Sequence, residues 1–143
     1  MIRSITLAVF LPTFAAAWEF SPSPLCTLSH QSDRTHLEIT YDPGIPEYRM
    51  SLDLLAGQWT SSKTFGMTFR GGRTHTIRTD RHEIDEKTLM VSDTGFGNVL
   101  DGLEFNAIAI AFTTSQSELV SLASAAPAVR KFRRCARKGP PTS

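Results

Sequence analysis

The sequence has no hydrophobic run long enough to cross a membrane and lacks the short motifs that identify common enzymes. Its longest mainly apolar run, Ile5–Phe14, spans about ten residues, whereas a membrane-spanning helix needs about twenty. It contains no Gly-x-Ser-x-Gly elbow, no Walker lysine and no Cys-x-x-Cys pair. These absences argue against a transmembrane helix, an α/β-hydrolase, a P-loop nucleotide hydrolase and a thioredoxin-like protein.

An excess of charge of one sign is also missing. The chain has 15 Lys and Arg against 14 Asp and Glu, so we expect no nucleic-acid partner, because such partners attract strongly basic chains. The distribution is nevertheless uneven. Residues 130–138 contain six cations and no acid, whereas residues 18–129 carry an excess of acidic residues.

The N-terminus has the three parts of a secretory signal peptide. Arg3 supplies a positive start, Ile5–Phe14 forms an apolar centre, and Ala15–Ala17 supplies the small residues that signal peptidase selects. This pattern predicts a signal peptide at residues 1–17, cleavage before Trp18, and a periplasmic or secreted protein. We expect residues 18–138 to form a single β-rich domain and residues 139–143 to form a disordered tail.

Only two cysteines are present, Cys26 near the start of the predicted domain and Cys135 near its end. A lone pair of cysteines in an exported protein is more often bridged than free. The sequence therefore predicts a disulfide that joins the two ends of the domain.

Alternating apolar and polar residues predict β-strands over most of the domain. This alternation covers Thr35–Tyr41 and Tyr48–Leu54, and the turn sequence Asp42-Pro43-Gly44 between them predicts a hairpin. Further strands are expected within the ranges Phe65–Phe69, Thr74–Thr79, Leu89–Ser92, Ala107–Thr113 and Glu118–Leu122.

Two other segments have less regular patterns. Trp18–Pro24 contains two prolines and predicts an extended lead-in rather than a helix. Val99–Phe105 fits either a short helical turn or an irregular loop.

One helix is predicted near the C-terminus. Ser124 is placed to be its N-cap and Pro127 falls in its first turn, where the missing N–H is tolerated. Val129, Phe132 and either Cys135 or Ala136 would share its apolar face. We therefore expect a mainly β fold, an antiparallel β-sandwich or open barrel of six to eight strands with one C-terminal helix.

A group of histidines and acids provides the only candidates for metal ligands. Imidazoles and carboxylates can bind a metal or transfer protons, and the candidates are His75, Asp80, His82 and Asp85. Their spacing is not His-Glu-x-x-His, so the favoured interpretation is a solvated connection between strands. We expect no metal and no cofactor.

The predicted helix carries arginines at helical spacing, namely Arg130, Arg133, Arg134 and Arg137. Such a face could contact an anionic surface, such as lipid head groups or an acidic protein. Alternatively, it is a solvated face whose last-turn cations complement the helix dipole.

Several segments distributed along the chain carry a resemblance to a known family. They are residues 18–20, 26–30, 40–43, 79–82, 95–105 and 125–132. Together they resemble a family of small exported proteins of alphaproteobacteria, some members of which are labelled as the helicase component of excinuclease ABC. The residues do not support that DNA-repair label, because such a helicase requires a P-loop and a long multidomain chain. The resemblance implies export but no function.

These observations favour a non-catalytic exported module that binds an unknown protein or small-molecule ligand or has a structural role. Two alternatives stay open. One is a small periplasmic metal-dependent or hydrolytic enzyme that uses the histidine and acid group. The other is an envelope protein that contacts an anionic surface through its basic helix.

Overall fold

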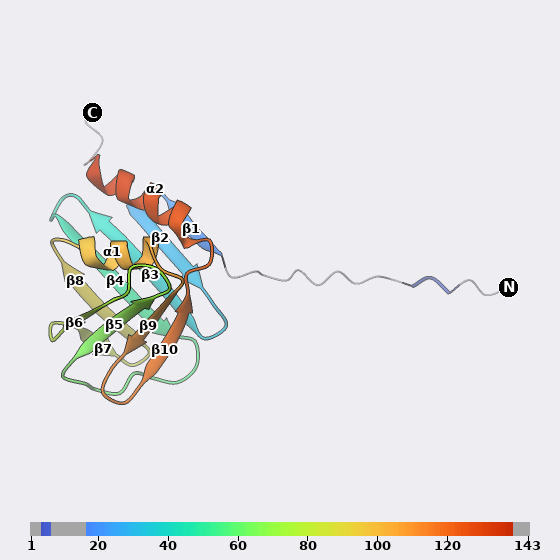
Figure 1. Cartoon of the computed structure of the whole chain (residues 1–143), viewed down its shortest axis with the longest axis horizontal. Coiled ribbons are helices and arrows are strands. Elements are labelled where there is room, and N and C mark those ends of the chain that lie inside the picture. Colours follow the sequence, from blue (N-terminus) through green and yellow to red (C-terminus); the bar gives the residue numbers. More distant parts are fainter. Residues whose placement is uncertain (1–3, 7–16, 139–143) are drawn as a thin grey trace.

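The computed structural model describes residues 4–6 and 17–138, which form two antiparallel β-sheets and two helices (Figure 1). The inward-facing side chains of both sheets belong to one buried core. The mainly β class and the C-terminal helix are thus confirmed. The described residues contain ten strands, which is more than the six to eight expected.

One sheet has six strands and the other has four. The six-stranded sheet has the order β1 (Trp18–Ser21), β2 (Cys26–Gln31), β3 (Thr35–Asp42), β4 (Glu47–Leu54), β8 (Thr88–Asp93) and β7 (Glu83–Asp85). The four-stranded sheet has the order β10 (Ser117–Ser121), β9 (Ile108–Phe112), β5 (Phe65–Arg70) and β6 (His75–Thr79). The helices are α1 (Gly97–Glu104) and α2 (Ala125–Arg137).

The predicted hairpin is confirmed by the pairing of β3 with β4. Ile39 lies opposite Met50 in this pairing, and both side chains are buried. In the turn, the backbone N–H of Gly44 donates a hydrogen bond to Asp42 Oδ1 at 2.9 Å, as expected for an Asp that starts a turn. Local alternation and turn chemistry are therefore sufficient to specify this unit.

The additional strands lie mainly where the apolar alternation is short or interrupted. The expected lead-in contains β1, and β2 follows it, with Leu28 and the polar residue His30 both turned into the core. A buried histidine breaks the apolar pattern that would reveal a strand. β7 has only three residues, too few to show a period.

The segment left open between helix and loop forms α1. Val99, Leu100 and Leu103 face the core. Gly102 packs against the ring of Phe69 so closely that a Cβ atom would lie 2.4 Å from the nearest ring carbon. A glycine is therefore required where α1 crosses the four-stranded sheet.

The predicted C-terminal helix is confirmed as α2, which packs along β1 and β2 beside α1 (Figure 1). Phe132 is fully buried, and Ala136 completes the apolar face. Cys135 instead forms the predicted disulfide with Cys26 of β2. Ser124 occupies the N-cap position, but its backbone is left-handed and its side chain makes no capping hydrogen bond.

The ends of the chain are described only in part. Most of the predicted signal peptide and the predicted tail at residues 139–143 lie outside the described residues. β1 begins at Trp18, directly after the predicted cleavage position. Neither helix in the described ranges has the length and apolar character that a membrane span requires.

Candidate functional site

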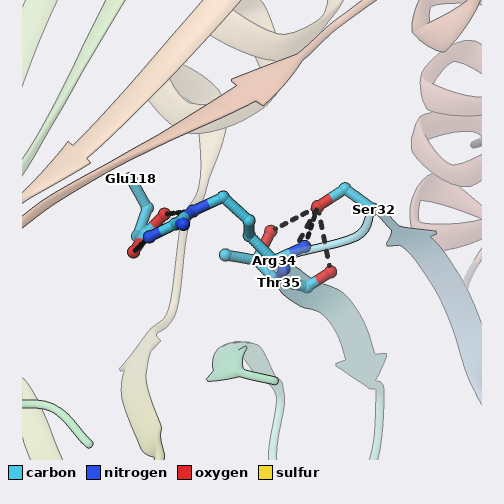
Figure 2. A network of polar contacts seen from close by, with 4 residues as sticks. All are labelled: Ser32, Arg34, Thr35 and Glu118. Atoms are coloured by element: carbon cyan, nitrogen blue, oxygen red, sulfur yellow. Dashed lines mark hydrogen bonds and ion pairs between the residues drawn. The ribbon is translucent and has the colours of Figure 1, made fainter. Parts of the chain in front are cut away.

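One long side of the sandwich is held closed by polar contacts between the two sheets. The indole Nε1 of Trp18 donates a hydrogen bond to the backbone oxygen of Ser121 on β10 at 3.0 Å. The guanidinium of Arg34, in the loop between β2 and β3, pairs with both carboxylate oxygens of Glu118 at 3.0 Å (Figure 2). Hydrogen bonds between Ser32 and Thr35 hold the Arg34 loop in place. We call this the clamped side.

The opposite side, between β6 and β8, is open. β7 pairs only with residues 88–90 of β8. Residues 91–93 of β8 therefore pair with β4 on one edge and have no paired strand on the β7 edge in the described part of the chain. A cleft of about 450 Å³ lies at this position between the two sheets. The Gly95–Val99 segment, which leads into α1, also lines it.

Both walls of the cleft contribute apolar side chains. Met67 and Ile77 line it from the four-stranded sheet, and Met50 and Val91 line it from the six-stranded sheet. Both methionines are buried, whereas Ile77 and Val91 are only half-buried. Apolar surface on the two walls therefore remains accessible to a bound molecule.

The rim of the cleft is polar. Arg81, in the connection between β6 and β7, lies 3.7 Å from Asp93 at the end of β8, and both residues line the cleft. Their side chains are 78% and 45% exposed, and such exposed pairs contribute little to stability. Breaking this ion pair therefore costs little free energy.

The four candidate metal ligands do not form a site. His75 Nδ1 lies 2.9 Å from the backbone oxygen of Arg73, and its Nε2 lies 3.0 Å from that of Asn98. His75 is the first residue of β6, whereas His82 follows the last one. His82 Nε2 lies 2.8 Å from the backbone oxygen of Ser62. Within residues 4–6 and 17–138, no three His, Cys, Asp or Glu side chains are placed to hold a metal ion. The imidazoles instead tie loops to their neighbours.

One arginine on the basic face of α2 belongs to an ion-pair network with α1. Arg133 pairs with Asp101 Oδ1 at 2.7 Å and with Glu104 Oε1 at 3.0 Å, both on α1. Burial by itself would lower the pKa of Arg133, but the hydrogen bonds and charges of the two carboxylates raise it above its usual value. Arg133 is thus paired with α1 and is not a free surface cation.

The other arginines of this face are exposed. A groove of about 300 Å³ lies between α1 and α2. It is lined by Arg130, Arg134 and Arg137, together with Arg133 and residues of the α1 segment. We call this space the basic groove. The sequence predicted the basic face, but it left the α1 segment open between a helical turn and a loop, so it did not predict the groove.

One buried histidine was not predicted as a special residue. His30 is 2% exposed, and its ring stacks on that of Trp18 with centroids 4.5 Å apart. Burial lowers the pKa of His30, and the backbone of Ala17 opposes this effect only in part. The imidazole therefore favours the neutral form in the folded protein.

No protein-family model, no curated protein and no solved structure matches the chain. The molecule itself offers two concave features of different chemistry. The cleft is lined by both apolar and polar residues, whereas the basic groove has four arginines and two acids. The cleft could take a small apolar molecule, and the basic groove could take an anion.

The sequence did not predict the cleft. Ile77 and Val91 each stand in an alternating strand, and in sequence they cannot be distinguished from core residues. Their accessibility arises because β6 is an edge strand and β7 stops short.

Proposed function

We propose that the protein is an exported, non-catalytic binding module that holds a small, mainly apolar molecule in the cleft between its two sheets. The observation that carries this proposal is the 450 Å³ cleft on the side opposite the clamped side. Its size falls within the range of about 300 to 1,000 Å³ typical of small-molecule sites.

The half-buried residues of the cleft explain why a ligand would bind. A molecule that covers Ile77 and Val91 removes apolar surface from water, which stabilises the complex by roughly 25 cal/mol for each Å² covered. Met50 and Met67 form an adaptable floor, since methionine fills irregular gaps well. The cleft is therefore suited to compact molecules that differ somewhat in shape.

The polar groups of the cleft favour binding over catalysis. Around the rim they comprise arginines, Asp93, the hydroxyls of Thr79 and Ser92, and the amide of Asn98. Neither a histidine nor a cysteine is among the residues that line the cleft. These groups can orient a ligand by hydrogen bonds, but they do not form a nucleophile with an adjacent base.

Export is supported by four features. The N-terminal sequence has the parts of a signal peptide, and the Cys26–Cys135 disulfide suits an oxidising compartment. β1 begins at Trp18, so removal of residues 1–17 leaves every strand intact. The resemblance to small exported proteins implies the same compartment.

The test uses protein isolated from the periplasmic and secreted fractions of its host. An N-terminal sequence that begins at Trp18 supports export, and protein found only in the cytosol with Met1 retained contradicts it.

The isolated protein is then titrated with N-phenyl-1-naphthylamine, a neutral apolar dye that fluoresces in apolar surroundings. Saturable binding is expected.

Two variants fill the cleft from opposite walls, Ile77→Trp in the four-stranded sheet and Val91→Trp in the six-stranded sheet. Each should weaken dye binding by about tenfold or more, a loss of about 1.4 kcal/mol. Leu119→Gln is the control, because Leu119 is 58% exposed and does not line the cleft. Dye binding that survives in the folded tryptophan variants, or disappears in the control, would rule out the cleft as the site.

A further inference from the structure

The arginines of α2 form a stripe along one side of the helix. Arg130, Arg133, Arg134 and Arg137 recur at intervals of three and four residues, which places them on neighbouring turns. All four line the basic groove. The helix contains no acidic residue that could neutralise them from within.

The acids of α1 neutralise only one of these arginines. Asp101 and Glu104 both pair with Arg133, and the Glu104 side chain is only 10% exposed. Arg130, Arg134 and Arg137 form no ion pair with any residue in the described part of the chain. The lining of the groove therefore keeps an excess of positive charge.

The helix dipole accounts for only part of this arrangement. Arg134 and Arg137 lie in the last turn of α2, where cations are favourable. Arg130 lies near the middle of the helix and gains little from the dipole. Cations three or four residues apart also repel one another and destabilise a helix, so a solvated face would be more stable with mixed charges.

We propose that the basic groove binds a phosphate-type oxyanion between Arg130, Arg134 and Arg137. Guanidinium groups match the geometry of phosphate oxygens and can donate two parallel hydrogen bonds to them. Arg133 is the positioning residue, because its pairs with α1 hold the two helices side by side. Arg73 stacks on Phe105 at 4.0 Å from the ring centroid and adds a cation beside the groove.

The oxyanion could be free in solution or part of a lipid head group, and the experiment separates these sources. In one arm, the ¹⁵N-labelled protein is titrated with inorganic phosphate, and amide shifts of α1 and α2 are compared with those in sodium chloride of equal ionic strength. In the other arm, binding is measured to phosphatidylcholine vesicles with and without phosphatidylglycerol.

The matched variants remove the same number of positive charges, either from the lining of the basic groove or from outside it. Arg130→Gln with Arg134→Gln removes two cations from the groove, whereas Lys131→Gln with Lys138→Gln removes two cations that do not line it. The arginine pair should weaken binding by about tenfold or more, as expected for charge-assisted hydrogen bonds. The lysine pair should change it by much less.

Phosphate binding that depends on the arginine pair supports a site for a soluble anion. Vesicle binding that requires phosphatidylglycerol and the arginine pair, with no response to inorganic phosphate, supports a lipid head group as the source. Equal losses in both double variants would show a diffuse charge effect and overturn the groove site. Absence of binding in both arms would overturn it as well.

Discussion

Removal of the Cys26–Cys135 disulfide is expected to destabilise the protein mainly through its unfolded state. The bridged residues are separated by 109 positions. For a loop of that length, the entropy of chain closure corresponds to about 4.8 kcal/mol, which is an upper value because measured effects are often smaller. Domains of this size are usually stable by only about 5 to 15 kcal/mol, so the loss would be a large fraction of the total.

The folded state should keep its structure without the bridge. α2 remains anchored by Val129 and Phe132, which are fully buried, and by the ion pairs of Arg133. The double variant Cys26→Ala with Cys135→Ala should therefore lose no more hydrogen-exchange protection in α2 than in the strands of the core. Its midpoint of urea unfolding should nevertheless fall markedly.

Tryptophan fluorescence provides the readout, because Trp18 and Trp59 are both buried in the folded protein. Urea unfolding is compared for the oxidised wild type, the reduced wild type and the double variant. The denaturant slope should rise slightly when the bridge is absent, since an uncrosslinked chain exposes more surface on unfolding. A loss below about 1 kcal/mol would refute the chain-entropy reasoning, and selective loss of α2 protection would show that the bridge holds the native helix instead.

Two further predictions concern single buried positions. The folded-state pKa of His30 is below its unfolded value of 6.5. The stabilising contribution of neutral His30 is therefore complete above pH 6.5 and is lost as the pH falls below 6.5. The free energy of unfolding falls by at most about 1.4 kcal/mol per pH unit. His30→Phe should flatten the dependence of unfolding free energy on pH between about 7 and 5, and an unchanged slope would contradict the assignment. Gly102→Ala should lower stability by about 1 to 3 kcal/mol, because the new Cβ would meet the Phe69 ring. Gly97→Ala is the control, since no atom lies within 4 Å of its added Cβ, and equal thermal unfolding of the two variants would disprove the packing argument.

The two sides of the sandwich have different roles in these proposals. On the clamped side, Trp18 and Arg34 join the first strands to β10. On the open side, the exposed Arg81–Asp93 pair spans the rim, and His75 of β6 contacts the backbone oxygen of Asn98. In the proposed function, a ligand would therefore enter on the side away from the Trp18 and Arg34 contacts.

The sequence by itself determined the features that depend on near neighbours. The hairpin of β3 and β4 follows from alternation over a few residues and from the turn at Asp42. The apolar face of α2 follows in the same way from helical spacing. The disulfide was predictable because only two cysteines exist, which leaves one pairing.

Tertiary structure alone decided which of these residues are accessible, paired or buried. Arg133 and Arg134 are adjacent in sequence, yet only Arg133 meets the carboxylates of α1, about thirty residues away. Likewise, Ile77 lines a cleft only because β7 stops short on the opposite sheet. The physical reason is that burial and charge pairing depend on what packs against a residue from distant parts of the chain, and local periodicity does not contain that information.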